Sequence, residues 1–157
     1  MTNEEQTKTD EERAWEATPN MVVMAIAEQA ESFYSEGRLD RAGELTKKLV
    51  RMRPESSYYW TLLGVIHRRR EETVQALQAL QRAAELDASN KNALVNLGET
   101  LVIAGKVPEG AEMLRAVFEM GYDEEMAPED HDVYTKRAGA QLAILQKVVE
   151  GIRAEAE

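Results

Sequence analysis

Apolar and small residues recur along this chain at an interval of 34 positions. Small residues hold two places of the interval: Ala30, Gly64 and Gly98 at one, and Ala42, Ala76 and Gly110 at the other. Within each interval, apolar residues follow the spacing of a helix, as Leu94, Leu97 and Leu101 do. Small residues suit places where two helices approach closely. A fixed period of this size therefore predicts a stack of helix hairpins.

Three such repeats fit residues 21–124 without a gap, and their predicted boundaries are 23–56, 57–90 and 91–124. Gly37 in the first repeat and Gly105 in the third stand where the first helix should end, because glycine readily adopts the left-handed conformation there. The second repeat has Arg70-Glu71-Glu72-Thr73 at its turn. We expect that turn to be the weakest join of the array.

The two flanks lie outside the period. Residues 1–20 form an acidic tail that is either disordered or a short helix around Glu11–Ala17, with Trp15 as its one large apolar side chain. Residues 125–157 predict an acidic linker and a helix that caps the last repeat. The apolar stripe of that helix consists of Tyr134, Ala138, Leu142, Leu145, Val149 and Ile152.

Composition and charge narrow the function classes. The chain of 157 residues contains no cysteine, which excludes disulfides and thiolate metal sites. It has no apolar run long enough for a signal peptide or a membrane span, so we expect a cytoplasmic protein. The formal net charge is −10, and residues 121–132 carry six acidic side chains and no basic one. Nucleic acid and anionic membranes are therefore poor partners.

Candidate catalytic and metal-binding residues are few. The sequence has no glycine-rich phosphate loop, nucleophile elbow or paired-histidine motif. His67 starts a basic run that ends at Arg70, a pattern typical of cations at a helix C-terminus. His131 stands between two aspartates, but adjacent residues on a helix do not face one another. We expect no catalytic residues, no metal and no cofactor, so the protein should not be an enzyme.

All three copies resemble the tetratricopeptide repeat, and the second is the fullest match through Trp60, Leu63, Gly64, His67, Ala76, Leu80 and Ala83. The resemblance implies an all-α fold, a right-handed superhelical array of three helix hairpins with a C-terminal capping helix. Its concave face would bind an extended peptide. A carboxylate clamp like that of eukaryotic co-chaperones is not expected, because its positions hold no lysine here and Glu31 would oppose a bound carboxylate.

First-helix residues that the core leaves free would line that groove. They are Met24, Ala27, Glu31 and Tyr34 from the first repeat, Tyr58, Thr61, Leu62, Val65 and Arg68 from the second, and Asn92, Val95, Asn96, Glu99 and Val102 from the third. For Val95 and Val102, packing against neighbouring helices is the alternative to exposure in the groove.

The layout is also similar to the class II chaperones of bacterial type III secretion, which hold translocator proteins before export. The similarity lies in the segments Ser35–Leu39, Leu63–Val65 with Arg68, and Leu97–Val102 with Gly105. The first repeat is poorer in aromatic residues than that family. The implied function is a non-enzymatic chaperone whose partner is an extended segment of a secreted translocator. Two further interpretations stay open: a scaffold or adaptor in a pilus or motility assembly, and a homodimer through the N-terminal segment around Trp15.

Overall fold

The structure of the protein is a computed structural model, and it describes residues 8–155. All regular secondary structure in this range is helical, which confirms the all-α prediction. The eight helices are α1 (Asp10–Glu16), α2 (Asn20–Ser35), α3 (Leu39–Met52), α4 (Ser57–Arg69), α5 (Thr73–Leu86), α6 (Lys91–Ile103), α7 (Val107–Gly121) and α8 (Val133–Glu155). None of them is long and apolar enough to cross a bilayer.

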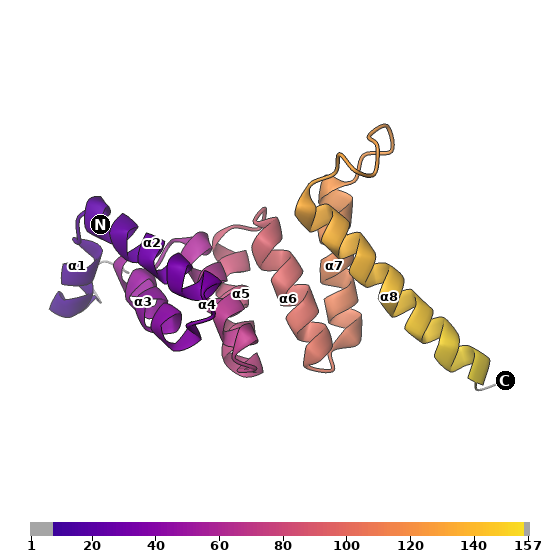
Figure 1. Ribbon diagram of the computed structural model, residues 1–157, viewed down its shortest axis with the longest axis horizontal. Coiled ribbons are helices and arrows are strands. Elements are labelled where there is room, and N and C mark those ends of the chain that lie inside the picture. The colour runs from indigo at the N-terminus through magenta and orange to yellow at the C-terminus, as the bar shows by residue number, and fades with distance from the viewer. Residues whose placement is uncertain (1–7, 156–157) are drawn as a thin grey trace.

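The helices pack as successive hairpins along one direction (Figure 1). Helix α2 pairs with α3, α4 with α5, and α6 with α7, and each hairpin rests on the next through α3–α4 and α5–α6. Helix α8 packs against α7 and α6 at the end of the row. The predicted array with a C-terminal helix is therefore confirmed. The residue boundaries of the three repeats remain predictions.

Small residues sit where the two helices of a hairpin cross. A Cβ atom added at Gly64 would lie 2.5 Å from Cγ of Leu80, and one added at Gly110 would lie 2.6 Å from the carbonyl oxygen of Gly98. Both separations are too short for non-bonded atoms. The recurring small residues are thus required by the close approach of the helix axes.

The turns inside the three hairpins share one backbone conformation. Gly37 and Gly105 have φ values of +75° and +81°, and Glu71 has a φ of +62° at the equivalent place of the second hairpin. A side chain is unfavourable in this left-handed region, because its Cβ atom crowds the backbone. The turn that the sequence predicts as the weakest join is therefore strained.

The N-terminal segment forms the short helix α1, which is one of the two predicted alternatives. Thr9 caps it, and its hydroxyl accepts a hydrogen bond from the backbone N–H of Glu12. Trp15 is half-buried against the apolar cluster of α2 and α3. The guanidinium group of Arg53 donates hydrogen bonds to the carbonyl oxygens of Glu16 and Thr18. These contacts hold α1 against the first hairpin.

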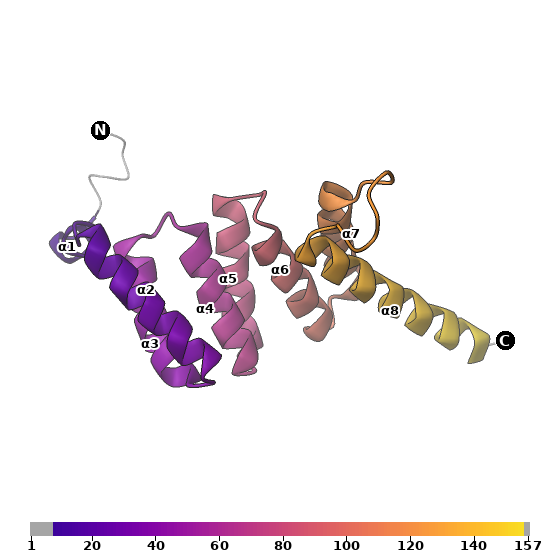
Figure 2. The same cartoon turned by 45° about the horizontal axis from the view of Figure 1, so that its top comes forward.

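Helix α8 is packed over only part of its length. Its first half buries Thr135 and Ala138, and Leu142 and Leu145 pack beside them on the cluster of α6 and α7. Its second half extends beyond α7 in both views (Figures 1 and 2). The capping role therefore belongs to the first half.

Candidate functional site

A pocket lies on the face of the array that is formed by the first helix of each hairpin. It has a volume of about 230 Å³, and we call it the groove pocket. Eight of the fourteen predicted groove residues line it, together with Arg137 of α8: Tyr34, Tyr58, Thr61, Leu62, Val65, Arg68, Asn92 and Asn96. Most of the lining comes from α4, which places one face of its middle turns toward the pocket. The structure thus brings residues of three successive hairpins together.

The α2 side of the groove pocket is aromatic. The guanidinium group of Arg69 lies 4.7 Å from the centre of the Tyr34 ring and donates a hydrogen bond to the Tyr34 carbonyl oxygen. The Tyr58 hydroxyl donates a hydrogen bond of 2.6 Å to a carboxylate oxygen of Glu31. Burial, and then this carboxylate, raise the pKa of Tyr58 to about 12. Both rings are therefore held in place before any ligand arrives.

The α4 and α6 walls combine apolar and polar groups. Leu62 and Val65 are half-buried and present aliphatic surface. Thr61 is buried, and its hydroxyl already donates to the Ser57 carbonyl oxygen, so it offers little free polar capacity. The Asn96 amide donates to the carbonyl and side-chain oxygens of Asn92. The pocket can therefore hold an apolar side chain of a bound segment, and its polar groups can form hydrogen bonds with the backbone amides of that segment.

A charged cluster closes the α8 end of the groove pocket. Glu99 accepts hydrogen bonds from Arg68 of α4 and from Arg137 of α8, and its side chain is only 10% exposed. Arg137 also donates to the side-chain oxygen of Asn96. Two guanidinium groups share one carboxylate, so the cluster holds one excess positive charge. It also fastens α8 to α4 and α6.

Six predicted groove residues do not line the pocket. Val95 is fully buried with Ala138, because α8 folds over that face of α6, and this is the packing alternative that the sequence left open for it. Ala27 is buried in the cluster of α2 and α3. Val102 packs against Gly110 of α7, as the alternative anticipated. Met24 is exposed and lines a different pocket together with Arg53 and Tyr59. Glu31 and Glu99 contact the pocket residues from outside it.

Sequence reasoning missed Arg137, the one pocket residue outside the repeats. It belongs to α8, for which the 34-residue period makes no prediction. The sequence did contain an indication, because Arg137 lies beside Tyr134 and Ala138 on the apolar stripe of this helix. A cation at such a position needs a carboxylate partner, since otherwise its charge is buried without compensation.

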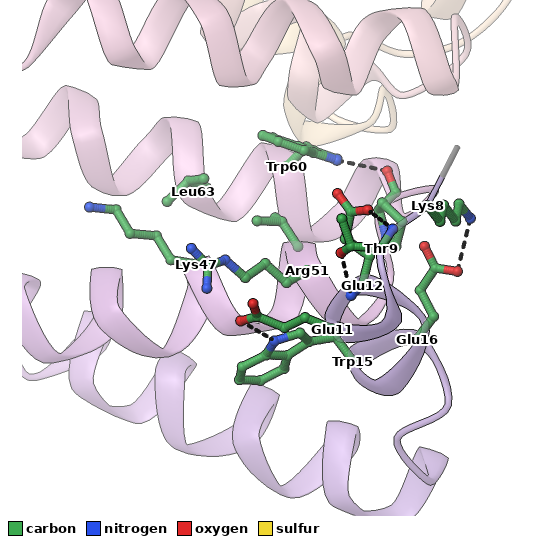
Figure 3. A pocket seen from close by; sticks show the side chains of 12 residues that line it. Lys8, Thr9, Glu11, Glu12, Trp15, Glu16, Lys47, Arg51, Trp60 and Leu63 are labelled. Carbon is green, nitrogen blue, oxygen red and sulfur yellow. Dashed lines mark hydrogen bonds and ion pairs between the residues drawn. The ribbon is translucent and has the colours of Figure 1, made fainter. Parts of the chain in front are cut away.

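A second pocket of about 650 Å³ lies on the opposite face of α4, between α1, α3 and α4. Trp15 and Trp60 flank it, with Arg51 between the two rings and Lys47 at one end (Figure 3). The Trp60 indole N–H donates to the Pro54 carbonyl oxygen. We call it the tryptophan pocket. The sequence did not predict this pocket, because Trp60 was considered there only as a residue that matches the repeat pattern.

The two histidines take structural positions. Nδ1 of His67 contacts a carboxylate oxygen of Glu72, and this contact is the main cause of the lowered pKa of Glu72. The ring of His131 stacks on Tyr122, with the ring centres 5.1 Å apart. Among residues 8–155, no group of three or more histidine or acidic side chains is placed to hold a metal ion.

Comparison with known families matches residues 28–93 to the tetratricopeptide repeat. Residues 28–93 therefore contain tetratricopeptide repeats. Peroxisome biogenesis protein 5 from Arabidopsis thaliana is 33% identical over 70 residues, which are 45% of this chain and 10% of that protein. The chain thus spans about a tenth of the length of this curated relative.

Solved structures share the fold at low identity. The Yersinia enterocolitica type III secretion translocator chaperone SycD, in an alternative dimer, has a TM-score of 0.75 and 16% identity over 85% of this chain and 98% of its own. SycD with a peptide of the translocator YopD has a TM-score of 0.70 and 16% identity, over 89% and 98%. The second domain of human RPAP3, in complex with an HSP70 peptide, has a TM-score of 0.68 and 18% identity, over 82% and 98%.

Proposed function

We propose that this tetratricopeptide-repeat protein is a non-enzymatic, cytoplasmic chaperone that holds an extended segment of a partner protein. The observation that carries the proposal is the groove pocket, where aromatic, aliphatic and amide side chains from successive hairpins converge. An extended segment offers an alternation of side chains and backbone polar groups that matches such a lining. Structures of SycD and RPAP3 with bound peptides support it by analogy of fold.

The mechanism is shielding. An apolar side chain of the partner would pack on Leu62 and Val65, and its backbone would bond with Asn92 and the Tyr58 hydroxyl. The groove would cover apolar surface that otherwise drives aggregation or premature association. Because Tyr34 and Tyr58 are fixed by Arg69 and Glu31, little side-chain freedom would be lost on binding.

The more specific form of the proposal is a type III secretion translocator chaperone. Its support is the resemblance of the repeat turns to that class and the fold shared with SycD. The partner would then be a secreted translocator, bound in the cytoplasm before export. Neither nucleic acid nor membrane would be a partner.

Paired substitutions test the groove. The double variant Tyr34→Ala and Val65→Asp removes one aromatic wall and places a charge on the aliphatic wall. We expect it to lose at least tenfold in affinity for a partner that co-purifies with the wild type, because an unpaired charge then faces an apolar side chain. Affinity is measured by titration calorimetry, and circular dichroism verifies that the array remains folded.

The matched control is Val74→Asp, which introduces the same charge at an exposed position of α5 outside the groove pocket. It should bind the partner like the wild type. If the control and the double variant bind equally, the partner does not use the groove pocket. If the partner is a membrane-inserting secretion substrate, the translocator chaperone is supported.

A scaffold or adaptor role is the second candidate. The observation that favours it is the projecting half of α8, which carries apolar side chains that no described residue covers. Recovery of a stable multi-protein assembly without any secreted protein, from native cells, would favour the scaffold over the chaperone.

Self-association through the N-terminal segment stays a prediction. SycD is described as a dimer, which supports self-association in this fold without locating it. In this chain Trp15 already packs on the first hairpin, so a second copy could reach only the rest of its ring. A variant lacking residues 1–18 should be monomeric if this segment forms the contact.

A further inference from the structure

The second half of α8 carries an apolar stripe that meets solvent. Ile144, Val148, Val149 and Ile152 are 54%, 53%, 43% and 63% exposed. We call residues 144–155 the α8 tail. In Figures 1 and 2 it lies beyond the last hairpin. Four branched aliphatic side chains on one short helical segment form a continuous patch rather than scattered surface residues.

This stripe continues the one that already packs against the array. Tyr134, Ala138, Leu142 and Leu145 of the same helix contact the cluster of α6 and α7. Val148 and Val149 follow Leu145 by three and four residues, and Ile152 follows Val149 by three, so all of them lie on the same side of α8. The helix surface that is buried in the first half is therefore exposed in the second, because the array ends beneath it.

The apolar residues of the α8 tail have the same spacing in both directions along the helix. From the midpoint between Val148 and Val149, Leu145 and Ile152 are equally far. An antiparallel second tail would thus set Val149 against Val148, a contact that occurs twice, and Ile152 against the part of the half-buried Leu145 that the cluster of α6 and α7 leaves uncovered. Such self-complementarity is the requirement for a two-fold interface between identical chains.

Charge and shape allow this pairing. The charged residues Lys147 and Glu150 lie on the opposite side of the helix from the stripe, where they remain in water. A Cβ atom added at Gly151 would meet nothing within 4 Å, so the backbone there is open to close approach. The strongly acidic segment 121–132 lies at the other end of α8, away from the contact.

We propose that two copies of this chain associate through their α8 tails, packed antiparallel about a two-fold axis between Val148 and Val149. The contact involves roughly three helical turns from each chain. That is less surface than the roughly 1,200 Å² that stable complexes typically bury, so the dimer is weak and concentration-dependent.

Sedimentation velocity of the full chain over micromolar to millimolar concentrations tests the proposal. The wild type should shift from monomer to dimer, and Val149→Asp should remain monomeric. Ala143→Asp, which places the same charge on the opposite side of α8, should dimerise like the wild type, and so should the variant lacking residues 1–18. A wild type that stays monomeric at every concentration overturns the proposal, as does a dimer that persists in Val149→Asp.

Cross-linking tests the orientation, because the natural chain has no cysteine. A mixture of Leu145→Cys and Ile152→Cys chains should form the heterodimeric disulfide under mild oxidation, whereas Ile152→Cys alone should remain reduced. Efficient cross-linking of Ile152→Cys to itself would mean a parallel arrangement and would overturn the antiparallel interface. Val74→Cys, far from the tail, measures random collision.

Discussion

At the scale of single residues, the turn of the second hairpin differs from the other two in one side chain. Glu71 has a φ of +62°, where Gly37 and Gly105 stand in the neighbouring hairpins. Its side chain is exposed. The cost of this residue is therefore in the backbone, since the left-handed conformation costs a non-glycine residue about 1–2 kcal/mol.

We predict that Glu71→Gly stabilises the protein by about 0.5–1 kcal/mol, because relief of the strain outweighs the added freedom of the unfolded chain. Urea unfolding followed by circular dichroism measures the change. Glu36→Gly is the control, since Glu36 has an ordinary φ of −75° and should lose stability. Equal destabilisation by both substitutions would contradict the strain at Glu71.

The carboxylate of Glu99 is a second single residue on which the stability of the fold depends. Its partners Arg68 and Arg137 are 23% and 35% exposed, so the cluster is partly screened by water. We predict that Glu99→Gln destabilises the fold by about 1–3 kcal/mol, below the cost of breaking a fully buried pair. The exposed pair of Arg41 and Glu44 supplies the control. Glu44→Gln should change the free energy of unfolding by less than about 0.5 kcal/mol, and a similar effect at both sites would contradict this role.

The start of α8 depends on the charge of Asp132. The side chain of Lys91 donates to this carboxylate, Thr135 adds hydrogen bonds, and together they hold the pKa of Asp132 well below its usual value of 3.8. A lowered folded-state pKa stabilises the fold above the usual value, and the stabilisation is lost as the pH falls below it. Asp132→Asn removes the charge and keeps a residue suited to cap the helix.

We therefore predict that Asp132→Asn is less stable than the wild type between about pH 5 and 7, and that the difference shrinks below about pH 4. Thermal unfolding across this range measures it. A difference of the same size at pH 7 and at pH 2.5 would show that the ion pair contributes nothing.

At the scale of the elements, the helix crossings decide how tightly each hairpin closes. The crossing of α6 and α7 has glycine on both helices, whereas the equivalent place of Gly110 in the earlier repeats holds Ala42 and Ala76. We predict that Gly110→Ala destabilises the protein by about 1–3 kcal/mol despite the better helix propensity of alanine, because its Cβ would meet backbone atoms of Gly98 and Val102.

The comparison for this prediction is Gly43→Ala in α3. There an added Cβ would lie 3.5 Å from Arg70 and 3.6 Å from Ile66, which is ordinary contact. That substitution should leave the free energy of unfolding unchanged or raise it by up to about 1 kcal/mol. A neutral Gly110→Ala would mean that the two helices can separate at little cost.

The period predicts the hairpins but not what lies outside them. Ala42, Ala76 and Gly110 located the crossings correctly because a helix contact repeats with the sequence. Ala27 was misplaced because α3 covers it, and the sequence could not decide between groove and core for Val95 because the helix that covers it is α8. A repeat pattern contains no residue that predicts where a single terminal helix packs. For the same reason the sequence did not predict Arg137 as a pocket residue.

At the scale of the whole molecule, the terminal helices α1 and α8 pack differently on the two ends of the array. Helix α1 folds against the first hairpin through Trp15 and the hydrogen bonds of Arg53. Helix α8 covers the inner face of the third hairpin and then leaves the array. The accessible part of the groove is therefore displaced toward the first and second hairpins, where Tyr34, Tyr58 and Val65 remain available.

The most direct test of this account locates a bound peptide on the molecule. A random peptide library displayed on phage is panned against the immobilised chain, and a selected peptide is titrated into the isotope-labelled protein by NMR. We predict shifts concentrated at Tyr34, Tyr58, Leu62 and Val65, and loss of binding in Val65→Asp. Shifts confined to the tryptophan pocket or to α8, with binding intact in Val65→Asp, would contradict the groove as the binding site.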